Sequence, residues 1–284
     1  MSTERGRHRR RTLRRRRAAL AAVLVLCAAG AAVLLTQGPS SPPARHVRHT
    51  IRTVRTLTEA ARVARILGYT SYVARGSRHR DDVALTFDDG PSADTPRILA
   101  VLERARVPAT FFEIGANVEA HPGITAALAR AGMEIGDHTE GHPPLARLGA
   151  AAQRAQLIAG ARAIAAAGAP WPVLFRPPYG SFDPATLSVA RSLGMLMVLW
   201  TVDTGDYARQ GVARIEYTAL SGARGGAIIL LHDGGGDRAQ TIAALPSIVA
   251  QLRRRRFHIV TVAQLLRDDP PPRDQPPPRS LAGD

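Results

Sequence analysis

The sequence predicts an α/β fold, a distorted (β/α) barrel of about seven parallel strands, preceded by a single N-terminal transmembrane helix. Two observations predict the barrel. Short apolar runs rich in strand formers alternate with helical patterns from Val83 onward, and polar residues repeatedly follow those runs. Such alternation is typical of a parallel sheet with crossover helices. A third observation predicts the membrane helix, because residues 18–35 contain no charged side chain.

Positive charge is concentrated at the N-terminus of the 284-residue chain. Residues 1–80 carry 18 arginines against Glu4 and Glu59, a net charge of +16, whereas the rest carries 20 arginines and 21 acids, a net charge of −1. That remainder is close to neutral and has no basic stripe with interleaved aromatics, so we do not expect nucleic-acid binding. Cys27 is the only cysteine, which excludes an intramolecular disulfide and a thiolate metal cluster.

The first 36 residues predict a membrane signal-anchor. Residues 1–17 form a basic segment with nine arginines, and the uncharged run that follows is about long enough to cross a bilayer as a helix. Fewer arginines follow it than precede it, so the positive-inside rule places residues 1–17 in the cytoplasm and the rest outside. We expect a single-pass anchor at residues 18–36. Cleavage near Ala28–Ala32 would instead give a secreted protein.

The remaining chain divides into three predicted parts. Residues 37–80 are rich in arginine and read as a linker or stalk, with one helical pattern near Thr58–Leu67 and a possible strand at Tyr69–Ala74. Residues 81–267 form the main predicted folded domain. Residues 268–284 contain six prolines and little apolar content, so we expect a disordered tail.

Within the domain, strands and helices are expected in turn. The predicted strands are Val83–Phe87, Ala109–Ile114, Met133–Ile135, Val173–Phe175, Met195–Val202, Ala227–Leu231 and His258–Val260. The predicted helices are Thr95–Ala105, Val118–Ala131, Ala150–Ala167, Pro184–Ser192, Val212–Leu220 and Thr241–Arg254.

Unusual polar residues follow five of these strands directly. They are Asp88 and Asp89 after the first, His138 and His142 after the third, Arg176 and Tyr179 after the fourth, Asp203 and Asp206 after the fifth, and His232 after the sixth. The carboxyl ends of parallel barrel strands meet on one face, which is where barrel enzymes hold their active sites. The sequence therefore predicts one site built from all five clusters.

Two histidines and a carboxylate indicate a metal site. His138 and His142 are four residues apart at a predicted helix start, so both rings can face one side. With either Asp88 or Asp89 they make the three-ligand set of a catalytic zinc-type site. The alternative interpretation is structural, with His138 capping a helix and His142 merely exposed.

The other clusters predict supporting roles. Arg176, at the end of a buried strand, needs a carboxylate partner, and an Asp beside the metal is the obvious one. The two prolines before Tyr179 force an extended backbone that would hold this residue near the metal. His232 leaves the core after an apolar run, and either Asp203 or Asp206 can orient and charge its imidazole.

With these motifs, the sequence resembles the NodB-type polysaccharide deacetylases, carbohydrate esterase family 4. The resemblance covers about Val83–Leu266 and rests on five motifs in order, TFDDG, HTEGH, RPPYG, DTGDY and LLH. It implies that Asp88 is the catalytic base and that Asp89, His138 and His142 bind the metal. The remaining implied roles are Arg176 as the tether of Asp88, the Tyr179 amide at the oxyanion, Asp206 as the partner of the general acid His232, and Leu230 in the acetyl pocket.

One position departs from the family pattern. Tyr207 stands where the family usually has tryptophan, which affects how the pocket is lined rather than the chemistry. The resemblance implies a metal-dependent hydrolase that removes N-acetyl groups from N-acetylglucosamine units of peptidoglycan or a chitin-like polymer. Zinc is the expected metal, with cobalt or manganese as alternatives. We expect a monomer at the cell membrane with its domain outside the cytoplasm. An O-acetyl esterase on acetylated xylan or another glycan, or a catalytically idle glycan-binding domain, would fit the same fold.

Overall fold

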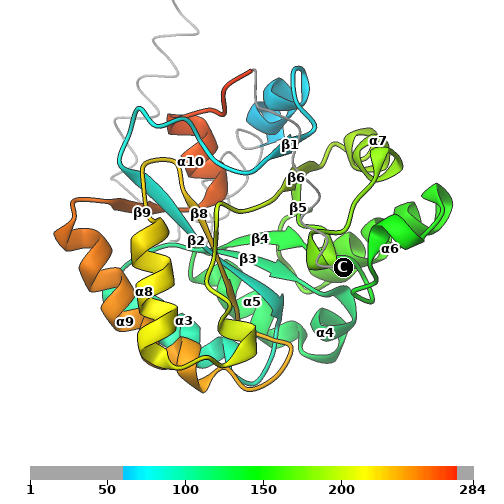
Figure 1. Cartoon of the computed structure of the whole chain (residues 1–284). Helices are drawn as coiled ribbons and strands as arrows, with labels where there is room; N and C mark the ends of the chain where they lie inside the picture. Colours follow the sequence, from blue (N-terminus) through cyan, green and yellow to red (C-terminus); the bar gives the residue numbers. More distant parts are fainter. Residues whose placement is uncertain (1–59, 274–284) are drawn as a thin grey trace, which may run out of the picture. The chain divides into compact units, whose positions relative to one another are not determined.

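A curled sheet of nine strands organises the residues that the structure describes, 60–273, and helices surround it (Figure 1). The structure is a computed structural model of the chain. The signal-anchor expected at residues 18–36 lies outside the described residues, as does most of the expected tail. Within residues 60–273, no helix combines the length and apolar character that crossing a bilayer requires.

The strands follow a single path with parallel neighbours. In chain order they are β1 (Tyr72–Val73), β2 (Asp82–Gly90), β3 (Thr110–Glu113), β4 (Glu134–Asp137), β5 (Leu174–Phe175), β6 (Leu196–Val198), β7 (Val202–Asp203), β8 (Ile228–His232) and β9 (His258–Val260). The spatial order is β1-β6-β5-β4-β3-β2-β8-β7, with β9 paired to the start of β2. Among the described residues β1 and β7 do not pair, so the sheet curls without closing into a barrel.

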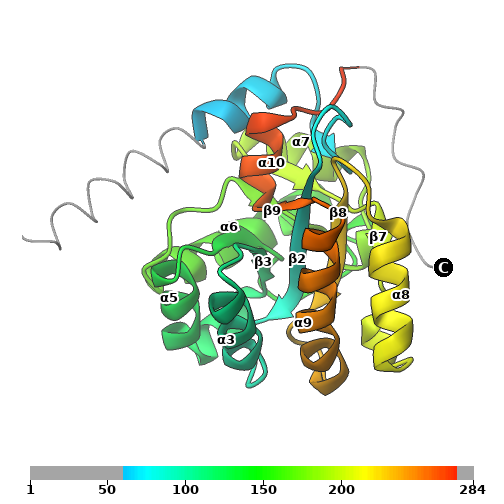
Figure 2. The same ribbon diagram turned by 90° about the vertical axis from the view of Figure 1, so that its left-hand side faces the viewer.

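Helices surround the sheet; of the labelled helices, all but α10, which packs on the inner core, lie around its outer side. They are α3 (Thr95–Ala105), α4 (Gly115–Ala120), α5 (Pro122–Arg130), α6 (Ala150–Ala166), α7 (Pro184–Ser192), α8 (Val212–Gly222), α9 (Ala239–Arg254) and α10 (Val262–Asp268). Short 3₁₀ turns lie at Leu145–Arg147, Pro178–Gly180 and Asp206–Ala208. Figure 2 shows α5, α3, α9 and α8 side by side, with the sheet behind them.

Alternation along β2 separates two cores. Leu85 and Phe87 face outward and are fully buried against the helices, where Phe87 stacks on Phe111 with ring centroids 5.0 Å apart. Burying a side chain of this size stabilises a fold by about 1.5–3 kcal/mol. Ala84 faces inward, into a core that residues 60–67 and α10 close at the start of the strands. Because this core fills the inner side at the start of the strands, the inward polar side chains lie at the carboxyl ends of the strands.

The parallel α/β prediction is confirmed, but the sheet has nine strands rather than about seven. The predicted strand Met195–Val202 divides into β6 and β7 because its backbone changes partner. The Leu199 amide donates to the Val73 carbonyl, whereas the Thr201 amide donates to the Ile228 carbonyl of β8. The ninth strand, β1, pairs with β6 and confirms the possible strand predicted at Tyr69–Ala74, outside the seven strands predicted for the domain.

Two helix predictions differ from the structure. The single helix expected at Val118–Ala131 is divided into α4 and α5 at His121, because Pro122 has no amide to continue the hydrogen-bond ladder and instead begins α5. The last helix, α10, follows β9 directly and was not predicted. Its N-cap is Thr261, whose side chain accepts a hydrogen bond from the Gln264 amide.

The domain extends beyond residues 81–267. Residues 60–67 are helical, and Val63, Ile66 and Leu67 pack in the inner core together with Val73 of β1. At the other end of the domain, the Ser77 hydroxyl donates to the Pro270 carbonyl. The described part of the predicted linker is thus part of the folded domain, because its apolar side chains complete the inner core.

Candidate functional site

The predicted site residues meet at the carboxyl ends of the strands, on the inner side of the curl. On β2 the inward positions run from Ala84 through Thr86 to Asp88, and on β8 they run from Ile228 through Leu230 to His232. Asp88 and His232 are direct neighbours in the register of these two strands. The inner face thus changes from apolar core to titratable side chains within five residues.

A β-bulge places two consecutive carboxylates at the site. Asp88 pairs with Phe112 and Gly90 with Glu113, so Asp89 is an extra residue in β2, and its φ of 72° is left-handed. Regular strand alternation would put neighbouring side chains on opposite faces, whereas a bulge re-aims them. The outcome is that His138 Nε2 lies 3.9 Å from Asp88 Oδ2 and 3.4 Å from Asp89 Oδ1.

Asp89, His138 and His142 form a three-residue group that can hold a metal ion. One atom of each lies within 4.8 Å of the others, and His142 Nε2 is 3.0 Å from Asp89 Oδ1. Burial alone would raise the pKa of Asp89, but its contacts with His138 and His142 outweigh burial and lower that pKa. Asp89 is therefore ionised at neutral pH, as a metal ligand must be.

The loop that carries the two histidines is not the helix start that their spacing suggested. Residues 138–144 have no helical structure, and Thr139 and His142 both have left-handed φ values. Pro143 and Pro144 follow at once and prevent a helix here. The loop is held instead by the Asp137 carboxylate, which accepts from the Thr139 amide, and by the Thr139 hydroxyl, which accepts from the His142 amide.

Each histidine is oriented through its other ring nitrogen. His138 Nδ1 lies 2.7 Å from the Arg176 carbonyl oxygen, and His142 Nδ1 lies 3.1 Å from the Tyr179 hydroxyl. A proton held on Nδ1 leaves Nε2 unprotonated and directed at Asp89, the arrangement that metal-binding histidines use. Two such imidazoles with one carboxylate fit a zinc-like ion that keeps positions open for water and substrate.

Arg176 joins Asp88 to the interior of the sheet. Its guanidinium is fully buried and donates to Asp88 Oδ1 at 2.7 Å, to the Thr86 hydroxyl at 2.8 Å, and to the Val198 and Leu199 carbonyls. Asp88 is thus the carboxylate partner that Arg176 required. A buried arginine with this many acceptors holds one carboxylate oxygen fixed and leaves Oδ2 facing the metal group.

Asp206, and not Asp203, is the partner of His232. Asp206 Oδ1 lies 2.7 Å from His232 Nδ1, and Asp206 Oδ2 accepts from the His232 amide at 2.9 Å. Asp203 is exposed and accepts from the Gly205 amide instead. Burial lowers the pKa of His232, but the hydrogen bond and charge of Asp206 outweigh it and raise that pKa, which favours the charged imidazolium at neutral pH.

Two tyrosines flank the site on its solvent side. Tyr179 is 60% exposed and has left-handed backbone angles, with its ring edge on His142. Tyr207 is 54% exposed and packs edge-on against His232, with ring centroids 5.4 Å apart. Leu230 is buried below His232 on the inner face of β8. The sequence-predicted residues are thus brought to one region. Asp203 lies beside it, where its charge raises the pKa of Tyr207, but it does not bond His232.

Two buried acids close to the site were not predicted. Glu113 and Asp233 are fully buried, and they receive hydrogen bonds from Thr125 and Thr95 respectively. Burial raises the pKa of Glu113 to about 8 and that of Asp233 to about 7. In β3, Phe111 and Glu113 face the outer side of the sheet and Phe112 faces the inner side. The sequence did carry a signal for this buried acid, because a charged residue stands in the short buried strand TFFE.

Glu113 should make the stability of the domain depend on pH. Its pKa is about 8 when folded and 4.5 when exposed, so its contribution to the free energy of unfolding is complete below pH 4.5 and is lost as the pH rises through 8. We expect Glu113→Gln to match the wild type at about pH 4 and to melt at least about 3 °C higher at pH 8. Thermal unfolding at both pH values measures this. Exposed Glu103→Gln is the control, and equal shifts at both pH values would contradict the expectation.

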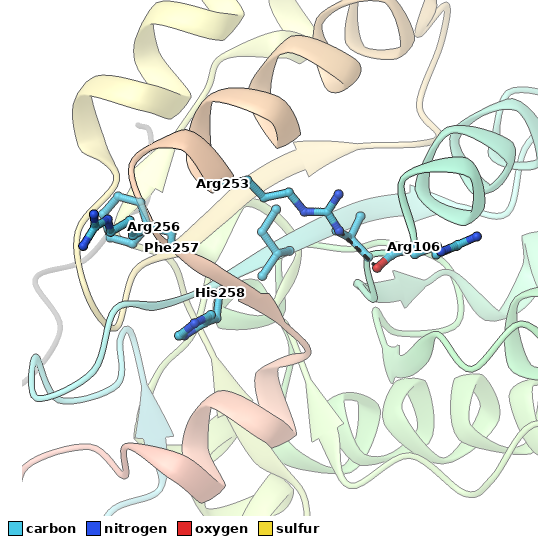
Figure 3. A pocket seen from close by; sticks show the side chains of 7 residues that line it. Arg106, Arg253, Arg256, Phe257 and His258 are labelled. Atoms are coloured by element: carbon cyan, nitrogen blue, oxygen red, sulfur yellow. Dashed lines mark hydrogen bonds between the residues drawn. The ribbon is translucent and has the colours of Figure 1, made fainter.

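A separate cavity lies at the opposite end of the strands (Figure 3). Its lining residues come from the turn after α3, from the last turn of α9 and the residues after it, and from β9. They are Arg106, Val107, Arg253, Arg256, Phe257, His258 and Ile259. Figure 3 shows the Arg106 and Arg256 side chains pointing away from each other, while Arg253 donates to the Arg106 carbonyl. The cavity contains none of the residues predicted for the site, and its charges do not converge on one point.

Comparison with known proteins agrees with this geometry. The family model described as polysaccharide deacetylase matches residues 75–198. The chain is 37% identical over 191 residues to the peptidoglycan-N-acetylglucosamine deacetylase of Bacillus cereus, covering 65% of this chain and 88% of that protein. It is 40% identical over 196 residues to the chitooligosaccharide deacetylase of a Bradyrhizobium species, covering 64% and 90%.

A solved structure has the same arrangement of elements. It is a peptidoglycan N-acetylglucosamine deacetylase in complex with 4-naphthalen-1-yl-N-oxidanyl-benzamide. The TM-score is 0.67 at 34% sequence identity, and the match covers 69% of this chain and 92% of that one.

Proposed function

Because the chain belongs to the NodB-type polysaccharide deacetylases of carbohydrate esterase family 4, we propose that it removes N-acetyl groups from N-acetylglucosamine units of a cell-wall polysaccharide. The products are acetate and a free amine on the sugar. The observation that carries this proposal is the convergence of the Arg176-bound Asp88, the group Asp89, His138 and His142, and the Asp206–His232 pair at one end of the sheet.

The protein supplies a base and a fixed geometry for the attack of water. Asp88 takes the proton of the attacking water through Oδ2, since its Oδ1 is held by Arg176. A divalent metal, held by Asp89, His138 and His142, would lower the pKa of that water and polarise the acetamide carbonyl. Zinc fits this donor set, and cobalt or manganese are the alternatives.

The leaving amine requires a proton, and the group that donates it is not the base Asp88. His232, kept charged by Asp206, donates it from Nε2, and its Nδ1 stays bonded to Asp206. The Tyr179 amide donates a hydrogen bond to the oxyanion of the tetrahedral intermediate, a contact worth roughly 3–4 kcal/mol in other enzymes. Leu230 and Tyr207 line the pocket for the acetyl group and the sugar.

The substrate class rests on the relatives. One relative is named as a deacetylase of the N-acetylglucosamine of peptidoglycan, and another as a deacetylase of chitooligosaccharides. Acetate release from peptidoglycan, chitin oligomers and acetylated xylan, measured in parallel with the detergent-solubilised full-length chain, tests the proposal. Release from either amide polymer supports it.

The same assay separates the alternatives. Release from xylan alone would make the protein an O-acetyl esterase. Absence of release from all three by protein that holds a stoichiometric metal ion would favour a catalytically idle glycan-binding domain. Asp88→Asn serves as the control for contaminating deacetylase, because it removes the base and keeps the three metal-binding residues.

The site is proposed to face outward from the cell membrane. The support is the uncharged span at residues 18–35 with nine arginines before it, and the cell-wall substrate named for one relative. Release of the protein after cleavage of the anchor would place the same domain outside the cell.

Protease treatment of intact spheroplasts checks this orientation. We expect the domain to be digested while a cytoplasmic marker protein remains intact. Protection of the domain under the same conditions, with digestion only after lysis, would reverse the proposed topology.

A further inference from the structure

The start of α9 reaches the acid side of the site. Thr241, in the first turn of α9, is almost fully buried, and its hydroxyl donates to Asp206 Oδ2 at 2.7 Å. A threonine in a helix commonly bonds a carbonyl of its own preceding turn. Here the hydroxyl instead bonds a side chain 35 positions away in the sequence, in the loop after β7.

This hydrogen bond differs in kind from the others on Asp206. The remaining donors to its carboxylate are Nδ1 and the main-chain amide of His232. Both belong to the residue that the carboxylate has to orient. Thr241 is therefore the contact that fixes the carboxylate plane independently of His232, so that Oδ1 stays aligned with Nδ1.

The helix start itself is anchored to the loop after His232. Arg238 is buried and donates to the Gly234 and Gly235 carbonyls and to the Asp206 carbonyl. Its amide donates to Asp94 Oδ2, in the loop that follows the metal-binding carboxylate. A side chain at Gly235 would collide with Asp89, so this loop also packs directly on the metal group.

We propose that Thr241 is a positioning residue for proton donation by His232, acting through the second oxygen of Asp206. The inference rests on the proposed function, because it concerns the acid of that reaction. It extends the site to α9, an element outside the five motifs of the sequence.

Thr241→Val tests this role, since it keeps the shape and removes the hydroxyl. We expect about a tenfold loss of kcat on N-acetylglucosamine oligomers, the effect of one lost hydrogen bond to a charged group. Hydrolysis of nitrophenyl acetate should change little, because a phenolate leaves without a proton. Thr241→Ser keeps the hydroxyl and should retain both activities at the wild-type level.

A second readout does not depend on turnover. The Nδ1 proton of His232, bonded to Asp206, should give a downfield NMR resonance in the wild type and in Thr241→Ser. In Thr241→Val it should broaden or shift as the carboxylate gains freedom. Thr241→Ala repeats both measurements should the valine variant fold poorly.

Two results would overturn the inference. One is an equal loss on both substrates by Thr241→Val, which would mean that the hydroxyl only supports the fold. The other is an unchanged His232 resonance together with unchanged kcat. A wild-type protein without deacetylase activity would instead refute the proposed function, and the resonance would still report whether Thr241 orients the pair.

Discussion

Replacing His232 with alanine should reduce hydrolysis of N-acetylglucosamine oligomers about 10²–10⁴-fold, the usual contribution of general acid catalysis. An amine is a very poor leaving group unless it is protonated, so amide hydrolysis depends on the proton that His232 donates. An aryl acetate expels a stable phenolate and should lose far less activity. Steady-state kinetics on both substrates, with metal content measured in parallel, gives the comparison.

Two carboxylates provide matched variants for this experiment. Asp206→Asn should show the same selective loss as His232→Ala in weaker form, because it removes the charge that favours the imidazolium. Asp203→Asn should retain activity on both substrates, since Asp203 contacts the Gly205 amide rather than His232. Equal losses on the amide and the ester in His232→Ala would mean that this residue supports the site structurally and is not its acid.

Replacing His142 with alanine should abolish most of the metal affinity and nearly all of the activity. The loss should exceed the 10–100-fold that removal of an outer-shell partner typically costs, because a direct ligand is deleted. Zinc titration of the metal-stripped full-length chain, followed by calorimetry, measures the affinity. Circular dichroism of the same samples confirms that the fold is retained.

An exposed histidine offers the control. His121 lies between α4 and α5 on the surface, and His121→Ala should bind zinc as the wild type does. Tight stoichiometric zinc in His142→Ala would remove this residue from the ligand set. It would leave Asp89 and His138 to find a different third partner.

Much of the site was predictable because the carboxyl ends of parallel strands lie together at one edge of the sheet. Asp88, His138, Arg176 and His232 each follow an apolar run, and a parallel sheet brings such positions to one edge whatever their separation in the chain. The need of a buried guanidinium for a carboxylate predicted an aspartate partner for Arg176, and the resemblance assigned that role to Asp88. The family motifs then assigned roles that spacing alone had left open. One example is the choice of Asp206 rather than Asp203 as the partner of His232.

What the sequence did not predict depends on local backbone geometry and on distant contacts. The bulge at Asp89 inserts one residue against β3, and nothing in TFDDGP distinguishes it from a regular strand end. The HTEGH spacing suggested a helix because four residues make about one turn, yet paired left-handed residues bring the rings together equally well. The contact between Thr241 and Asp206 could not be predicted for another reason. It depends on how α9 packs against the loop after β7, which no local sequence pattern specifies.

The strand β1 and the helical residues before it limit, under the proposed membrane topology, how far the active site can lie from the bilayer. Under the proposed topology, only residues 37–59 remain as a tether between the anchor and the folded domain. These 23 residues span at most about 80 Å when fully extended, against about 150 Å for the 44 residues of 37–80. With the shorter tether, the site would act only on glycan strands that lie within this reach of the membrane surface.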